Sequence, residues 1–556
     1  MLQSILLVFA LVGGAPFASN RDTLRHAVAW GPVLDRILEI LAARHPDAFA
    51  RAGRRQFQIG VDALRRELPR EDDATVTVRL MQLVASLQDG HTQLEPVRDT
   101  AFAHWFPVRF YAFADGLYIT AIDRPHQAIV GTRVTRIGDL AADEALRRAE
   151  TVMGADNAWG QRENSFALSN ATMLHAMGIS PDPHAVTLEV EQGGTRRKVR
   201  LESVHVADGS FDGRFRGEMF PPFRNDSIPW VTAFAGRAPR DFRVRDSRLP
   251  LHLRYRLHYF CEPVNDGLYV QINFMANADS QSFEQFTDSV FHRLDRNPVR
   301  KLVIDLRYNS GGNGDLVPRF ADALKVRAPR PPWRQLYVLL GPKTFSAAIM
   351  LAHGIQASVP DAVTVGEPSG AGYNSFGDPM DFEIEGTGLR LSVSTLYHQL
   401  GRFDDFRPYI PVNLPAVMTA RDYFAGRDPP LELVLGNDET RSLTALLGTD
   451  GPAAATAAFL ARESRYGGLA WWEPFSERSV NTIGYEMLRD GNREGAAATF
   501  ALNTLAYPAS WNTWDSYGEA LALLGHAQAA RNAYQRSLTL NPGNASARTY
   551  LESHSP

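Results

Sequence analysis

Residues 301–314 read KLVIDLRYNSGGNG, a short apolar run that ends in a turn with two adjacent glycines. A second apolar run followed by a turn occurs shortly afterwards. Residues 335–351 read QLYVLLGPKTFSAAIML, in which an apolar run and a turn lead to a helix-like stretch opened by Ser346. Short apolar runs between turn residues are typical of strands buried on both faces of a sheet. Two such units in succession predict an α/β core around a largely buried sheet.

Ser346 has two possible uses at the start of its predicted helix. Its hydroxyl can cap the helix by accepting from an unpaired amide of the first turn. Alternatively, it can act as a nucleophile where the helix N-terminus favours negative charge. The adjacent glycines at 311 and 312 either form an ordinary strand-to-helix turn or expose bare backbone amides to a ligand. Beside Ser346, the amides of Gly311 or Gly312 and of Ala347 form a candidate oxyanion hole.

The rest of the chain changes its pattern several times, which predicts a multidomain α+β protein. Apolar residues at three- and four-residue intervals indicate helices in the first part of the chain, and strand-like alternation follows. The predicted segments are a signal peptide (1–19), an N-terminal helical domain (20–100), a strand-rich module (101–206), a linker or covering segment (207–254), the α/β core (255–436) and a helical tail (437–556).

The N-terminal stretch MLQSILLVFALVGGAPFAS has an apolar run followed by small residues, as a secretory signal does. Cleavage is expected after Ala15 or Ala18, and the protein is expected to be secreted or periplasmic. No Lys or Arg precedes the apolar run, so a misassigned start and a short buried segment are the alternatives. No other stretch has transmembrane length, which predicts a protein that is not integral to a membrane.

The tail carries an internal repeat between positions 480 and 550. Its glycines, aromatic residues and prolines recur at one fixed spacing of about 34 residues, a period typical of tetratricopeptide helix pairs. A plain helical bundle is the alternative, and the repeat predicts a surface that docks a protein partner. The recurring pairs are Gly484 and Gly518, Gly491 and Gly525, Phe500 and Tyr534, and Pro508 and Pro542.

Composition excludes several functional classes. The formal net charge is −4 and no basic block occurs, so a nucleic-acid partner is not expected. A single cysteine, Cys261, excludes a disulfide framework, a thiolate metal cluster and a CxxC redox pair. Neither a metal-ligand motif such as HExxH nor a nucleotide-binding glycine motif is present, so no metal and no cofactor are predicted.

Four motifs together resemble the tail-specific, or C-terminal processing, serine proteases. They are DGHT at 89–92, LVIDLRYNSGGNG at 302–314, TFSAA at 344–348 and VGEPSGAGYNSFGD at 365–378. The chain is most similar to the branch that includes tricorn protease and interphotoreceptor retinoid-binding protein. This resemblance implies a crotonase-like ββα-type core, a PDZ-like module at 101–206 that holds a peptide, and a serine-type peptidase activity.

Within this family the serine is activated either by a lysine or by a histidine. The lysine branch places its base in a turn downstream of the serine, where this chain has Ala371 and Gly372. No lysine follows Lys343, so a Ser–Lys dyad is excluded on the family pattern. The resemblance instead assigns the base to His91, preceded by Gly90 where tricorn has an auxiliary serine. His398, on a predicted strand, is the rival base.

The resemblance also implies an acid that orients the histidine. Asp405, in the stretch FDDFRPYIPV downstream of Ser346, aligns best, and Asp404 is its neighbouring alternative. Either carboxylate could instead pair with Arg402 or Arg407. If Asp405 lay beside His91, it would favour the imidazolium and raise the pKa of His91.

The loop GEPSGAGYNSFGD is expected to line the substrate cleft, with Glu367, Ser369 and Asn374 as candidate lining residues. Glu367 and Asp378 flank it and are interpreted as anchors of the loop rather than catalytic groups. The motifs therefore predict a Ser346–His91–Asp405 peptidase. Two alternatives stay open on the same fold, a non-catalytic protein that binds a ligand or peptide, and an esterase.

Overall fold

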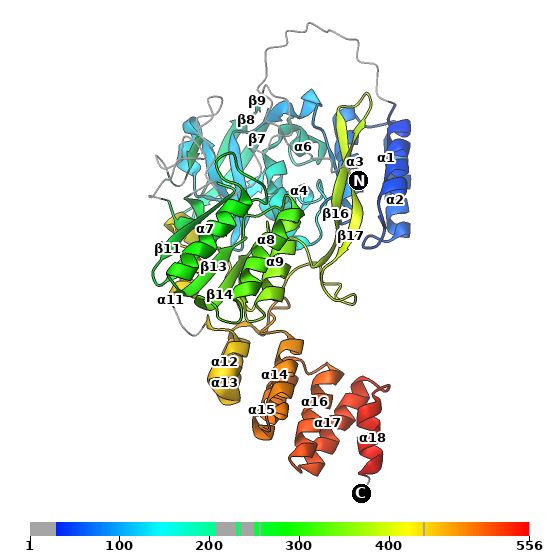
Figure 1. The fold of residues 1–556 in the computed structure, drawn as a ribbon. Coiled ribbons are helices and arrows are strands. Elements are labelled where there is room, and N and C mark those ends of the chain that lie inside the picture. The colour runs from blue at the N-terminus through cyan, green and yellow to red at the C-terminus, as the bar shows by residue number, and fades with distance from the viewer. Residues whose placement is uncertain are drawn as a thin grey trace, which may run out of the picture.

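The computed structural model describes residues 29–206, 230–232, 234, 249–254, 257–436 and 440–554. The predicted signal peptide and most of the predicted linker lie outside these ranges. Figure 1 shows a body of mixed helices and sheets from which a helical tail extends on one side. The predicted α/β and α+β character is confirmed. Within the described ranges, no helix combines the length and the apolar character needed to cross a bilayer.

The N-terminal segment folds into amphipathic helices. Their buried faces carry apolar residues such as Leu34, Ile37 and Leu41 at helical spacing. The third helix is capped by Asp72, whose carboxylate accepts from the Thr75 amide at 2.8 Å. The helices are α1 (Trp30–Arg44), α2 (Arg54–Glu67) and α3 (Asp73–Ala85).

The strand-rich module is built around a sheet in the order β10-β4-β5-β7-β8, with β3 paired to β4 and β6 to β5. Its strands are β3 (Val108–Phe113), β4 (Gly116–Asp123), β5 (Arg133–Ile137), β6 (Leu140–Ala141), β7 (Ala185–Gln192), β8 (Thr195–Glu202) and β10 (Trp230–Thr232). A separate pair is formed by β2 (His104–Trp105) and β9 (Val204–His205). The helices are α4 (Ala142–Ala149), α5 (Ala158–Arg162) and α6 (Ala171–Ala176).

The α/β core has a sheet in the order β11-β12-β13-β14-β15-β18, parallel from β12 onward. Its strands are β11 (Tyr259–Val264), β12 (Gly267–Ile272), β13 (Val299–Asp305), β14 (Trp333–Leu340), β15 (Val363–Gly366) and β18 (Leu414–Pro415). One face packs on α7 (Phe283–Arg296), α8 (Val317–Arg327) and α9 (Ala347–Ser358). The other face packs on α11 (Pro429–Gly436), which follows α10 (Ala420–Ala425) in the chain. Burial on both faces explains why β13 and β14 read as continuous apolar runs.

One long strand lies elsewhere than its sequence position suggests. β17 (Leu389–Gln399) pairs with β16 (Asn374–Ile384) and with β1 (Gln93–Glu95) in a separate sheet, not in the core sheet. Leu391 and Val393 of β17 are buried in the same apolar cluster as the N-terminal helices. The β16–β17 hairpin therefore reaches out of the α/β core and packs against the N-terminal helices, which attaches the N-terminal domain to the core (Figure 1).

The tail consists of successive helices, in which the pair α14 and α15 is followed by the matching pair α16 and α17. Gly484 and Gly518 recur in this pattern because each first helix must leave space for an aromatic ring of the second. An added Cβ at Gly484 would collide with Phe500, and one at Gly518 would press on Tyr534 at 3.1 Å. The helices are α12 (Leu443–Thr449), α13 (Gly451–Tyr466), α14 (Glu477–Arg489), α15 (Arg493–Ala506), α16 (Trp511–Leu523), α17 (Ala527–Leu540) and α18 (Ala545–Ser553).

Candidate active site

Ser346 stands at the junction between the β14 turn and α9, and its hydroxyl does not cap the helix. Its backbone has φ 54° and ψ −125°, a region that residues with a side chain rarely occupy. Such a conformation costs about 1–3 kcal/mol and persists only where the surrounding fold imposes it. Thr344 contributes to this by donating to the Leu306 carbonyl at 2.9 Å, and the Phe345 amide donates to the Asn309 carbonyl at 3.0 Å. The turn thus holds a half-buried hydroxyl at the positive end of α9.

The partner of Ser346 is His91. The Nε2 atom of His91 lies 2.9 Å from the Ser346 Oγ, although 255 residues separate them. The imidazole stacks on Phe345, with ring centroids 4.4 Å apart and planes at 28°. Gly90 makes room for this stack, since an added Cβ there would lie 2.6 Å from the Phe345 ring. A serine at position 90 would therefore clash with the ring on which the base rests.

Sheet pairing explains how a distant histidine reaches the serine. His91 lies just before β1, and Gln93 of β1 is opposite Ser392 of β17. The Ser394 amide donates to the Thr92 hydroxyl at 3.1 Å, beside this pairing. Because β17 belongs to the hairpin that follows the serine in the chain, its pairing with β1 brings the base to the edge of the core.

The structure does not bring Asp405 to His91, which corrects the interpretation of Asp405 as the orienting acid. Its carboxylate makes a bidentate ion pair with Arg407, with distances of 2.9 and 2.7 Å, and Arg407 also contacts Glu473 at 3.0 Å. The alternative, Asp404, pairs in the same way with Arg402 at 2.8 and 2.7 Å. The predicted alternative, pairing with a neighbouring arginine, is what the structure shows.

The Nδ1 atom of His91 is buried and has no hydrogen-bond partner among the described residues. The carboxylates with the largest electrostatic effect on the ring are instead those of Asp89 and Asp156, both buried. Neither residue was predicted from the sequence as a partner of the histidine. Asp89 carried a signal, since it is the first residue of the DGHT motif, whereas nothing in the sequence connects Asp156 with the histidine.

Burial lowers the pKa of His91 from its ordinary 6.5, because the charged imidazolium loses its hydration. Asp89 and then Asp156 act in the opposite direction, and the net direction is downward. The expectation of a raised pKa, which depended on Asp405, is wrong for this geometry. His91 is therefore neutral at neutral pH and can accept a proton from Ser346.

This electrostatic balance gives a prediction for the pH profile. We expect kcat/KM to rise with pH through a single protonation whose midpoint lies below the 6.5 of an ordinary imidazole, because this ratio reports the base in the free enzyme. The measurement is initial rate against pH at low substrate concentration. A midpoint well above neutrality would indicate a base other than His91.

Asp405→Asn gives a second prediction. A local ion pair at the surface contributes little to rate or stability, so kcat/KM should fall by less than about tenfold. Asp404→Asn should have a similarly small effect. Steady-state kinetics of the two variants checks this, and a loss of about a thousandfold at position 405 alone would restore Asp405 as the acid.

The three candidate oxyanion donors differ in whether their backbone amides already have a hydrogen-bond acceptor. The Gly311 amide already donates to the Asn309 side chain at 2.9 Å. The amides of Gly312 and Ala347 have no hydrogen-bond acceptor among the described residues. Gly311 has φ 112° and lies so close that an added Cβ would stand 2.6 Å from the Ser346 Cβ. Gly311 thus allows close approach to Ser346, and Gly312 and Ala347 are the candidates whose amides lack an acceptor among the described residues.

The residues expected to line the cleft hold the loop in place. Ser369 is fully buried, where its hydroxyl donates to the Ala371 carbonyl and accepts from the Ile410 amide, both at 2.7 Å. The Asn374 side chain donates to the carbonyls of Arg402 and Asp405. Glu367 forms an ion pair with Arg162 of α5 at 3.0 Å. None of these contacts includes Ser346 or His91.

His398 lies next to the site without joining it. Its Nε2 is 2.8 Å from the Asp378 carboxylate. An added Cβ at Gly377 would be 2.9 Å from the His398 ring and 3.9 Å from Cε1 of His91, so Gly377 lies next to both imidazoles. The base that contacts Ser346 in this structure is His91.

Comparison with known proteins finds solved structures with a similar fold. No family model matches the sequence, and no curated protein sequence matches it. Among solved structures, a crystal structure of a CPAF mutant matches with a TM-score of 0.52, at 12% identity over 75% of this chain and 98% of its own. The photosystem II D1 C-terminal processing protease matches with a TM-score of 0.32, at 14% identity over 75% of this chain and 99% of its own. The chain has the fold of CPAF, so the resemblance inferred from the motifs is confirmed at the level of fold.

Proposed function

We propose that this protein is a serine peptidase in which Ser346 is the nucleophile and His91 is its general base. The observation that carries the proposal is the 2.9 Å contact between His91 Nε2 and Ser346 Oγ. A serine used as a helix cap would point at its own helix, whereas this hydroxyl makes no such bond. A nucleophile within hydrogen-bond reach of an uncharged base is the arrangement that acyl transfer requires.

The chemistry follows from this geometry. Oγ of Ser346 attacks the scissile carbonyl while Nε2 of His91 accepts its proton, and the same proton then passes to the leaving amine. The developing oxyanion is stabilised by the amides of Gly312 and Ala347, which have no other acceptor among the described residues, and by the N-terminus of α9. A water molecule, activated by His91, then hydrolyses the acyl-enzyme.

Several expectations accompany this function as parts of the proposal. The predicted PDZ-like module would hold an extended peptide by strand addition or through its terminal carboxylate. The helical tail would dock a protein partner, because its helix pairs repeat with the tetratricopeptide period. Secretion or a periplasmic location depends on the predicted signal at residues 1–19.

The alternatives are an esterase, which would use the same residues, and a non-catalytic binding protein. Reaction with a fluorophosphonate probe and hydrolysis of a set of unfolded protein substrates test all three. We expect covalent labelling at Ser346 together with peptide-bond cleavage. Labelling with turnover of activated esters but of no peptide would favour the esterase. Complete absence of labelling and turnover would favour the binding protein.

A further inference from the structure

The buried Nδ1 atom of His91 has no carboxylate bonded to it among the described residues, yet the imidazolium formed during the reaction needs negative charge nearby. We propose that Asp89 and Asp156 are positioning residues for His91, and that the α1–α2 connection holds both of them through His45 and Arg51. The proposal rests on the peptidase function proposed above. It adds that the N-terminal domain sets the orientation and charge of the base.

The Asp89 carboxylate is hydrogen-bonded to the backbone of His91. Its Oδ1 accepts from the His91 amide at 3.0 Å. Its Oδ2 is close to three side-chain donors: the Thr92 hydroxyl at 2.6 Å, the Ser394 hydroxyl at 2.6 Å and His45 Nε2 at 3.0 Å. The residue is 3% exposed, and although burial opposes ionisation, these bonds and the nearby His91 hold the pKa of Asp89 well below its usual range. Asp89 is therefore a negatively charged group that is held in a fixed position in the loop of His91.

His45 has a defined tautomer in this arrangement. Its Nδ1 accepts from the Asp47 amide at 3.1 Å, so the proton of the neutral ring resides on Nε2 and is donated to Asp89. The ring also packs against Phe376 of β16, with centroids 4.6 Å apart. His45 follows the last residue of α1, which ties this anchor to the N-terminal helices.

The Asp156 carboxylate is hydrogen-bonded to the backbone of Gly90, the residue before His91. Its Oδ1 accepts from the Gly90 amide at 2.8 Å, and its Oδ2 lies 2.9 Å from the Arg51 guanidinium. The same guanidinium donates to the Gln88 carbonyl at 2.8 Å. Burial raises the pKa of Asp156, and Arg51 opposes that rise. Arg51 thus both favours the charged form of Asp156 and pins the turn that leads to His91.

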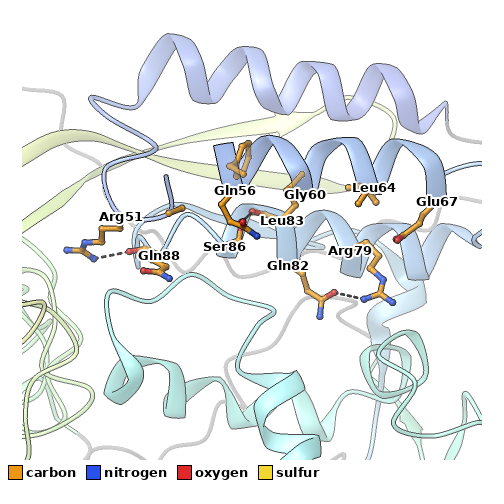
Figure 2. A pocket seen from close by; sticks show the side chains of 13 residues that line it. Arg51, Gln56, Gly60, Leu64, Glu67, Arg79, Gln82, Leu83, Ser86 and Gln88 are labelled. Carbon is orange, nitrogen blue, oxygen red and sulfur yellow. Dashed lines mark hydrogen bonds between the residues drawn. The ribbon is translucent and has the colours of Figure 1, made fainter. Parts of the chain in front are cut away.

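Arg51 reaches this position from the end of a groove between α2 and α3, with a volume of about 450 Å³. Figure 2 shows the guanidinium at one end of the groove, bonded to Gln88, with Arg79 toward the opposite end. Gln88 has a left-handed backbone with φ 59°, so the turn before Gly90 is strained and needs external support. The bond from Arg51 to the Gln88 carbonyl provides that support.

The charged groups that face His91 come from several elements. Asp89 and Asp156 approach from its own loop and from the segment before α5, while Asp378 and His398 approach from the β16–β17 hairpin. Asp378 is already close to His398 at 2.8 Å. Two anions bonded to successive amides of the His91 loop therefore fix the backbone of the base and also stabilise its charged form in the transition state.

Asp156→Asn separates charge from hydrogen bonding, because the amide oxygen can still accept from Gly90 while the negative charge is gone. We expect kcat to fall about 10–100-fold with little change in KM, the range found when the hydrogen-bond partner of a metal-bound histidine is removed. Loss of the anion also lowers the pKa of His91, so the acid limb of kcat/KM should move to lower pH.

Arg51→Met should act in the same direction, because it favours the neutral form of Asp156. The double variant should be no worse than the more affected single variant.

Asp295→Asn is the matched control, since Asp295 pairs with Arg327 at 2.7 and 2.6 Å on the surface of α7 and α8. It should change neither rate nor pH limb. Fluorophosphonate labelling of Ser346 at saturation should persist in all variants, which distinguishes loss of positioning from failure of the proposed function.

A second readout does not depend on hydrolysis. In Ser346→Ala protein, the NMR titration of the His91 ring should shift to lower pH when Asp156→Asn is added. If Asp156→Asn does not fold, Arg51→Met carries the same two tests. A folded, labelled Asp156→Asn enzyme with an unmoved acid limb, an unchanged kcat and an unshifted His91 titration would overturn the inference.

Discussion

Under the proposed function, Ser346→Ala is expected to lower kcat by about five to six orders of magnitude, as removal of the nucleophile does in subtilisin. The variant should also lose all fluorophosphonate labelling. The reason is that the hydroxyl bonded to His91 has no substitute in the turn: the neighbouring Thr344 hydroxyl is buried and donates to the Leu306 carbonyl. Active-site titration and single-turnover kinetics of the purified variant measure the effect.

The same substitution should leave the free energy of unfolding within about 0.5 kcal/mol of the wild type, because Ser346 caps no amide whose bond would be lost. Ser346→Gly should be inactive but more stable by about 1 kcal/mol, since glycine accepts φ 54° without strain. Urea unfolding of the three proteins checks both statements. Undiminished hydrolysis by either variant would sink the assignment of the nucleophile.

His91→Ala should be nearly as damaging as loss of the serine, because a hydroxyl without a base is a poor nucleophile. Combining the two substitutions should cost little more than either alone, since the pair acts as one unit. His91→Gln, which retains more of the packing against Phe345, should be equally inactive. This comparison separates the loss of the base from the loss of the stacked ring.

His398→Ala is the informative control for the base. It removes an imidazole next to Gly377 that pairs with Asp378 and makes no contact with Ser346. Activity should stay within about tenfold of the wild type, because no proton transfer passes through it. An inactive His398 variant beside an active His91 variant would reverse the assignment of the base.

Much of the core and of the reacting pair could be predicted from the sequence. Apolar runs that end in glycine or in a serine turn indicate buried strands followed by helices, and β13 and β14 have this form. The family resemblance carried by the DGHT motif assigned the base to His91, and the structure places this histidine 2.9 Å from the Ser346 hydroxyl. These features are local, and local features are what a sequence displays directly.

The acid could not be predicted, because spacing along the chain does not determine which charges meet in space. Asp405 has a suitable distance in sequence from Ser346, but Arg407 is only two residues away and captures its carboxylate. Of the two carboxylates with the largest effect on His91, Asp89 lies in its own loop, whereas Asp156 comes from a separate part of the fold. Asp156 contacts Gly90 although 66 residues separate them, and no periodic pattern in the sequence predicts this contact.

The sheet to which β17 belongs could not be predicted for a related reason. Alternation of apolar and polar residues identifies a strand but not the sheet to which it belongs. Leu391 and Val393 could have faced the core sheet equally well. Their burial against the N-terminal helices depends on the hairpin reaching out to β1, which is a tertiary choice.

The hairpin also determines when, during synthesis, the site can exist. A ribosome makes His91 long before Ser346, and it makes β17 (Leu389–Gln399), the strand that pairs with β1 beside the histidine, later still. A nascent chain that ends between Ser346 and Leu389 therefore carries both side chains but lacks the strand that pairs with β1 beside His91. Under the proposed function, hydrolysis would begin only after the chain has closed on itself, and the unfinished polypeptide would be protected from the Ser346–His91 pair.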